Sequence, residues 1–71
     1  MLKVGDIVEA QVWLTPHYGL YLSYGGVNIL CDVGDQQPEL DGYRVGDIVQ
    51  VKILRINGDA ISGRVLDGKH H

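Results

Sequence analysis

The sequence predicts an all-β protein, a small closed barrel of five antiparallel strands. Valine and isoleucine alternate with polar residues at a period of two, ten glycines interrupt these stretches, and no segment has the spacing of a long amphipathic helix. A closed barrel is expected because five short strands with no helix to cover them would otherwise leave sheet edges unpaired. The chain has 71 residues, which is enough for one core only.

The first three strands are expected over residues 6–14, 18–24 and 27–33. In the first of them the even positions from Val8 to Leu14 are apolar and alternate with polar residues, the pattern of a strand with one buried face. Pro16 ends this strand because proline lacks a backbone donor. Gly25 and Gly26 then favour a tight hairpin between the second strand and the third.

The second half of the chain contains a loop and two more strands. Residues 34–42 are rich in turn-forming types without periodicity, so we expect a loop there, with at most one short helical turn. The fourth strand is expected over 47–56 and the fifth over 59–66, joined by the hairpin signal Asn57-Gly58. Residues 1–66 therefore form the predicted domain, and residues 67–71 a frayed tail. The expected core contains Val8, Val12, Leu22, Ile29, Val49, Val51 and Ile53.

Residues 4–8 and 45–49 have the same sequence, Val-Gly-Asp-Ile-Val. A repeat this short does not indicate duplicated domains. Because glycine and aspartate both favour turns, we expect each Gly-Asp pair to form a turn that begins a curved barrel strand.

The composition favours a binding module over an enzyme. Cys31 is the only cysteine, so no intrachain disulfide can form, and we expect a buried, unreactive thiol in a reducing, cytoplasmic setting. The N-terminus does not resemble a secretory signal, and no apolar run has the length to cross a membrane. No set of residues has the pattern of a catalytic triad, a phosphate-binding loop or a metal site. The sequence therefore predicts no catalytic residue, no metal and no small-molecule cofactor.

Three motifs occur in order along the chain. They are Val-Gly-Asp-x-Val at 4–8, the aromatic-Gly-x-aromatic stretch at 18–21, and a second Val-Gly-Asp-x-Val at 45–49 that continues into an apolar run to Ile56. In this order and spacing the chain resembles the RNA-binding domain family named after ribosomal protein S1. The resemblance covers nearly the whole chain and implies a five-stranded antiparallel OB-fold barrel.

The resemblance also implies a binding face on the second and third strands. In the family, two aromatic residues stack on bases and a His, an Asp and an Arg complete the contacts. Tyr18 and Tyr21 match the two aromatic residues, whereas the third strand has no histidine to match. The family's Asp falls on Asn57 or Asp59, and its Arg falls near the start of the fifth strand, with Arg64 close by.

Two further residues are candidates on physical grounds. Trp13 is on the more polar face of the first strand, where an exposed ring can add a stacking surface. Arg55 is at a position where the alternation of the fourth strand would place an apolar residue, and a basic side chain there can meet a phosphate. The candidate RNA-binding residues are therefore Trp13, Tyr18, Tyr21, Arg55, Asn57 and Arg64.

The charge balance limits the expected affinity. Six basic and nine acidic residues give a net charge of −3 and an isoelectric point near 5.3, whereas a dedicated nucleic-acid-binding domain usually has one above about 9. We therefore expect weak, sequence-tolerant binding of single-stranded RNA, accessory to translation or RNA turnover.

Two other functions remain open. A degenerate barrel of this family could serve as a protein-interaction or oligomerisation module, which suits the acidic charge. A small ligand or an oligosaccharide could occupy the same face, since OB barrels bind such molecules there. Solvent-facing rings of Trp13, Tyr18 and Tyr21 beside Arg55 or Arg64 would favour RNA, whereas burial in an extended apolar patch would favour a protein partner.

Overall fold

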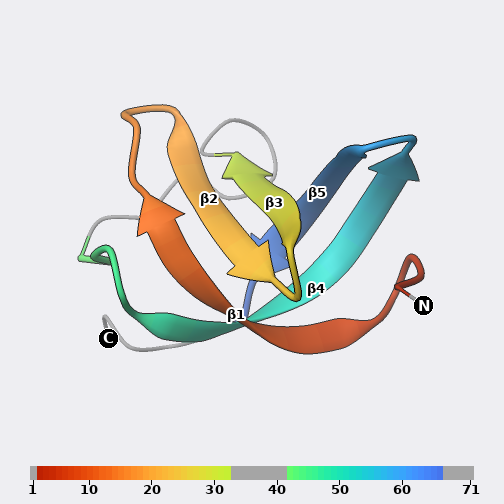
Figure 1. The fold of residues 1–71 in the computed structure, drawn as a ribbon, viewed down its shortest axis with the longest axis horizontal. Coiled ribbons are helices and arrows are strands. Elements are labelled where there is room, and N and C mark those ends of the chain that lie inside the picture. The colour runs from red at the N-terminus through yellow and green to blue at the C-terminus, as the bar shows by residue number, and fades with distance from the viewer. Residues whose placement is uncertain (1, 33–41, 67–71) are drawn as a thin grey trace.

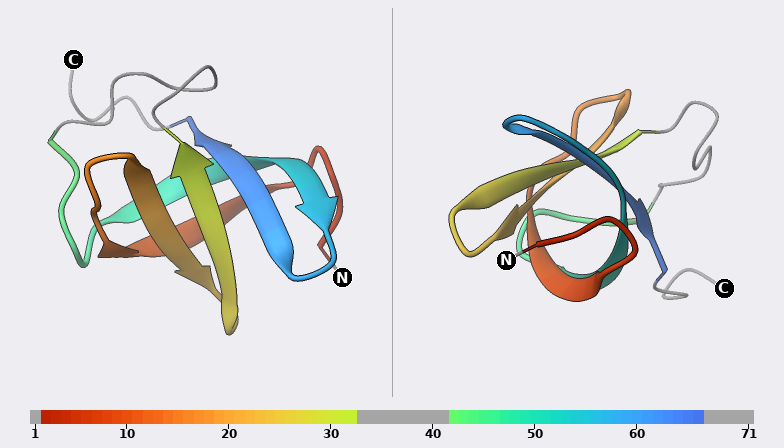
Figure 2. Two further views of the ribbon diagram at one scale, coloured as in Figure 1. Left: turned by 90° about the horizontal axis from the view of Figure 1, so that it is seen from above. Right: turned by 90° about the vertical axis from the view of Figure 1, so that its right-hand side faces the viewer.

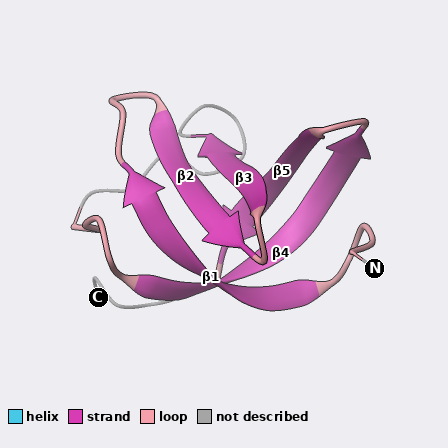
Figure 3. Cartoon of the chain, viewed as in Figure 1, coloured by secondary structure: helices cyan, strands magenta, loops and turns pink. Residues whose placement is uncertain are grey.

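A computed structural model describes residues 2–32 and 42–66, and these residues form five strands (Figure 1). Each strand lies within one residue of its predicted bounds. Strands are the only regular elements in the described ranges, and they are joined by turns and loops (Figure 3). The predicted loop at 34–42, apart from Gly42, and the predicted tail at 67–71 lie outside the described residues. The strands are β1 (Ile7–Leu14), β2 (Gly19–Tyr24), β3 (Val27–Asp32), β4 (Ile48–Asn57) and β5 (Ala60–Val65).

The strands close into a barrel in the order β1-β2-β3-β5-β4, which confirms the predicted fold class (Figure 2). Four of the pairings are antiparallel, but β3 and β5 run parallel, with Leu30 opposite Ser62. The expectation of a wholly antiparallel barrel was therefore wrong at this one pairing. The reason is geometric, because strand direction cannot alternate at every step around a ring with an odd number of strands.

The core lies inside the barrel and consists of side chains from all five strands. Of the seven residues predicted for it, six are almost completely buried, and Val8 is partly buried and packs against the others. Tyr43 is also buried, whereas Tyr24, at the end of β2 next to the turn, is 38% exposed. The complete buried cluster is Ala10, Val12, Leu20, Leu22, Ile29, Cys31, Tyr43, Val49, Val51, Ile53 and Val65.

The two Val-Gly-Asp-Ile-Val segments form equivalent turns. The Asp6 carboxylate accepts a hydrogen bond from the backbone N–H of Lys3 at 2.8 Å, and the Asp47 carboxylate accepts one from Arg44 at 2.9 Å. In each turn the glycine has a positive φ, which residues with a Cβ rarely adopt. The turns lead directly into β1 and β4, so each Gly-Asp pair begins a barrel strand as expected.

Two β-bulges change which way side chains point. One shifts the register between Val12 and Leu14 on β1, and the other between Ile53 and Arg55 on β4. An extra residue in a strand reverses the inward and outward positions that follow it. Leu14, at an apolar even position, is consequently 44% exposed, and Arg55 points outward although Ile53 faces the core.

Candidate nucleic-acid interface

One row of outward-facing residues crosses all five strands. Each member pairs in register with the next, and on β2 and β3 the residues on either side of the member are buried. We call this the outer row. Neighbouring strands lie about 4.8 Å apart, so Tyr21 and Arg55, three strand spacings apart, are separated by roughly 14 Å along it. The outer row consists of Leu14, Tyr21, Leu30, Ser62 and Arg55.

Four aromatic rings gather at the β1–β2 end of the outer row. The ring centroids of Trp13 and Tyr21 are 5.9 Å apart, and those of Tyr18 and Tyr21 are 6.2 Å apart and meet edge to face. His17 packs against Tyr18 at 5.6 Å. Trp13 is 43% exposed and Tyr18 44% exposed, so the cluster faces solvent. We call these four residues the aromatic cluster. It contains the three predicted aromatic site residues, and sequence reasoning had not included His17.

The two tyrosines are linked through their hydroxyl groups. The oxygens of Tyr18 and Tyr21 are 3.3 Å apart, and either group can donate the hydrogen bond. This hydrogen bond is the main cause that raises the pKa of Tyr18 above its usual value of 10, with smaller contributions from partial desolvation and the charge of Tyr21. Tyr18 is a neutral phenol at physiological pH, as a tyrosine of ordinary pKa would also be.

Gly19, between Tyr18 and Tyr21 in the aromatic motif, packs closely against β3. Gly19 is buried and pairs with Asp32 at the point where β2 begins against β3. A Cβ at this position would overlap the backbone carbonyl oxygen of Cys31, so only glycine allows this close approach. Its N–H also closes the preceding turn by donating to the carbonyl of Pro16 at 3.1 Å. The glycine of the aromatic motif therefore has a packing role.

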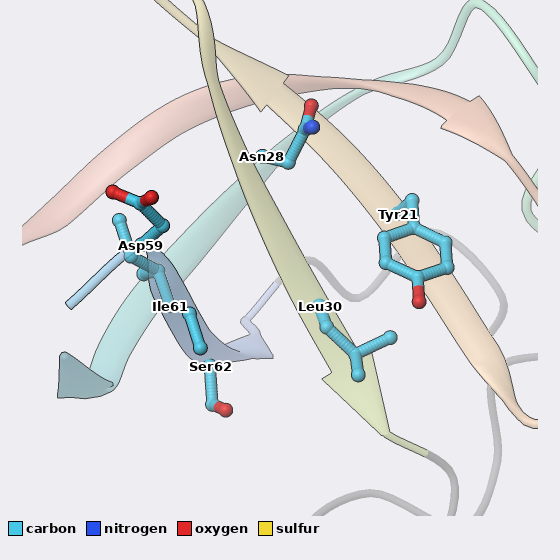
Figure 4. Close-up of a pocket in the computed structure, with 7 residues that line it drawn as sticks. Tyr21, Asn28, Leu30, Asp59, Ile61 and Ser62 are labelled. Atoms are coloured by element: carbon cyan, nitrogen blue, oxygen red, sulfur yellow. The ribbon is translucent and has the colours of Figure 1, made fainter. Parts of the chain in front are cut away.

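A hollow of about 210 Å³ lies along β3, with Tyr21 of β2 on one side and the β4–β5 turn and the start of β5 on the other (Figure 4). We call it the Tyr21 pocket. Asn28 is at its edge and also lines a second hollow next to Trp13. Sequence reasoning missed Asn28, although its outward position between Val27 and Ile29 was a usable signal. The Tyr21 pocket is lined by Tyr21, Asn28, Leu30, Asp59, Ala60, Ile61 and Ser62.

The remaining predicted site residues are on the β4–β5 side. Arg55 pairs with Ser62, and Asn57 pairs with Ala60, so both neighbour residues that line the Tyr21 pocket. Arg64 pairs instead with Lys52 and lies off the outer row. All three side chains are exposed. The aromatic cluster and Arg55 therefore lie at opposite ends of the outer row, with β3 and β5 between them. Arg64 lies outside this row.

Cys31 is buried, as predicted. It has no exposed surface, and burial raises the pKa of its thiol to about 12. Because the thiolate is the nucleophilic form, this cysteine is unreactive at neutral pH. Within residues 2–32 and 42–66, no group of His, Cys, Asp and Glu is arranged to hold a metal ion. The same residues contain no helix long and apolar enough to span a bilayer.

The sequence was compared with protein-family models and with curated proteins. No model of a protein family matches the chain. The small ribosomal subunit protein bS1 of Helicobacter pylori (strain J99) is 40% identical over 60 residues, which is 78% of this chain and 11% of that protein. The chain thus spans about a tenth of the length of this curated relative.

Solved structures share the fold at low sequence identity. The uncharacterized protein MJ1198 from Methanocaldococcus jannaschii matches with a TM-score of 0.80 at 18% identity, over 96% of this chain and 97% of that one. GSP13 from Bacillus subtilis matches with a TM-score of 0.78 at 20% identity, over all of this chain and 61% of that one. These matches show the fold alone, and the similarity to part of bS1 supports an OB-fold domain of the S1 type.

Proposed function

We propose that this domain binds single-stranded RNA weakly, through the aromatic cluster, and that it acts as an accessory to translation or RNA turnover. The observation that carries the proposal is the solvent-facing contact of Trp13, Tyr21 and Tyr18 at one end of the outer row. Exposed rings on a sheet accept the flat face of any base, and each stacked base contributes about 1–3 kcal/mol. Stacking of this kind is insensitive to base identity.

The charge of the protein explains why the affinity should be low. A net charge of −3 opposes the approach of a polyanion, and only local basic groups can neutralise phosphates. Arg55, at the far end of the outer row from the aromatic cluster, is the basic residue best placed to do so. Most of the binding free energy should therefore come from stacking, with one to three phosphate contacts.

The cellular role is proposed from the similarity to a ribosomal protein. The chain matches a small part of bS1, whose name places that protein in the small ribosomal subunit. A cytoplasmic setting agrees with this similarity and with a single reduced cysteine. No membrane or small-molecule cofactor enters the proposal.

The direct test replaces Tyr21 and compares it with a tyrosine outside the aromatic cluster. Tyr21→Ala should weaken the binding of a short single-stranded RNA by roughly 5- to 150-fold at low salt, because it removes the central ring. Tyr24→Ala is the matched control, since Tyr24 is 38% exposed on the same strand and has no ring contact with the aromatic cluster among the described residues. Binding should be followed by amide chemical shifts during an RNA titration. If no amide of Tyr18, Tyr21 or Arg55 shifts, the proposal fails.

One observation favours the alternative, a protein-interaction or oligomerisation module. The two repeats leave four aliphatic side chains well exposed, at Val4, Ile7, Val45 and Ile48. Exposed aliphatic groups of this kind are available to a protein partner. Concentration-dependent mass in light scattering, abolished by Ile48→Lys and unaffected by Tyr21→Ala, would support this function in place of RNA binding.

A further inference from the structure

The Tyr21 pocket has polar side chains at its edge, which stacking on the aromatic rings does not use. Its walls include the apolar side chains of Leu30 and Ile61, but its rim carries Asp59 and Asn28 (Figure 4). Apolar walls with a few polar groups at the edge are typical of a site that holds a flat ring and reads its hydrogen-bonding edge. The volume of about 210 Å³ is about seven times the roughly 30 Å³ that one water occupies in the liquid.

The carboxylate of Asp59 restricts which base can be read. A carboxylate accepts hydrogen bonds through two oxygens and donates none. Guanine alone among the four RNA bases presents two adjacent donors on its Watson–Crick edge, the N1–H and the 2-amino group. On the same edge, adenine and cytosine each have one donor beside an acceptor, and uracil has one donor between two acceptors. A bidentate pair with a charged acceptor is the strongest of these arrangements.

We propose that the Tyr21 pocket binds a guanine base of single-stranded RNA, with the Asp59 carboxylate accepting from the N1–H and the 2-amino group. This inference rests on the proposed RNA binding and adds a base preference at one position to the sequence-tolerant stacking. Asn28 can both donate and accept, so its amide suits the remaining polar atoms of a base in the pocket.

The charges around the pocket favour entry of a base over entry of the backbone. Asp59 repels phosphate, so the sugar-phosphate chain should pass on the Arg55 side. Arg55 pairs with Ser62, which lines the pocket, and so lies one strand away from it. A nucleotide can therefore place its base against Asp59 and its phosphate near Arg55.

The position of Asp59 is set by the hairpin that carries it. Gly58 and Asp59 form a two-residue turn between Asn57 and Ala60, which pair in register. The parallel pairing of β3 with β5 then brings this turn next to the strand that carries Asn28. The two polar groups of the rim therefore come from segments far apart in the sequence.

The test uses short oligouridines of one length that differ only in the central base. The guanine oligomer should bind roughly 5- to 150-fold more tightly than those with adenine, cytosine or uracil, the discrimination expected of one bidentate pair. Inosine lacks the 2-amino group alone, so the inosine oligomer should lose part of this preference. Equal affinity for all five oligomers would overturn the inference and leave the proposed RNA binding intact.

Two variants separate base reading from a general charge effect. Asp59→Asn removes the charged double acceptor and should bring the guanine oligomer to within about twofold of the others. Glu9→Gln removes one negative charge from an exposed position that pairs with Gln50, away from the pocket, and should preserve the guanine preference. If both variants change all oligomers alike, Asp59 acts only through its charge and the inference is wrong. If no oligomer binds the unmodified protein, the proposed function itself fails.

Discussion

Gly63 on β5 is a position where the barrel leaves no room for a side chain. A Cβ there would lie 2.6 Å from Cγ2 of Val51, 3.0 Å from the carbonyl oxygen of Lys52 and 3.1 Å from Cγ2 of Ile29. Carbon atoms pack best at about 3.5–4.0 Å, so the substitution Gly63→Ala creates overlap on both sides of β5. Val51 and Ile29 have no exposed surface and cannot turn away into solvent.

The expected loss of stability follows from this overlap. Extra methyl groups in a well-packed core cost about 1–3 kcal/mol. A core of this size supplies only about 3–5 kcal/mol of net stability, so Gly63→Ala should remove a large share of it. With a urea m-value near 1 kcal/mol/M, the unfolding midpoint should fall by roughly 1–3 M.

Urea unfolding followed by circular dichroism measures this midpoint, and a second variant tests the cause. Val51→Ala alone should cost about 1–3 kcal/mol through lost burial and a residual cavity. It also removes the Cγ2 atom that a Cβ at Gly63 would strike. Gly63→Ala should therefore cost at least about 0.5 kcal/mol less in the Val51→Ala background than in the unmodified protein. Strictly additive costs, or an unchanged midpoint for Gly63→Ala alone, would refute the packing argument.

Three further changes test the thiol, the basic residue and the aromatic motif. Cys31 should react with a thiol reagent only after unfolding, because it is buried. Burial raises the pKa of the Cys31 thiol from 9.0 to about 12. The stability that the buried neutral thiol contributes should therefore be complete below pH 9 and should disappear as the pH rises towards 12. The Cys31→Ala variant should not show this loss of stability at high pH. Arg55→Ala should flatten the slope of log affinity against log salt by about 0.7, whereas Tyr21→Ala should leave the slope unchanged. Gly19→Ala should lower the urea midpoint, because its Cβ would overlap the carbonyl oxygen of Cys31, and a midpoint equal to that of the unmodified protein would contradict this.

Local features of this protein could be predicted from the sequence because their causes are local. The alternation of apolar and polar residues placed all five strands to within one residue, and six of the seven predicted core residues are nearly completely buried. The turns at Asp6 and Asp47 depend on hydrogen bonds between residues three apart, which turn chemistry predicts. Tyr18 and Tyr21 were both predicted from one short motif, and they lie only three residues apart, at the start of β2.

The tertiary structure decided what depends on closure of the barrel. Periodicity does not specify which strand meets which, so the parallel pairing of β3 with β5 was not predicted. Leu14 and Arg55 owe their outward positions to bulges, which adapt each strand to its partners. Asn28 and Asp59 line the same pocket because closure sets β5 and its turn beside β3, a proximity that no sequence spacing encodes.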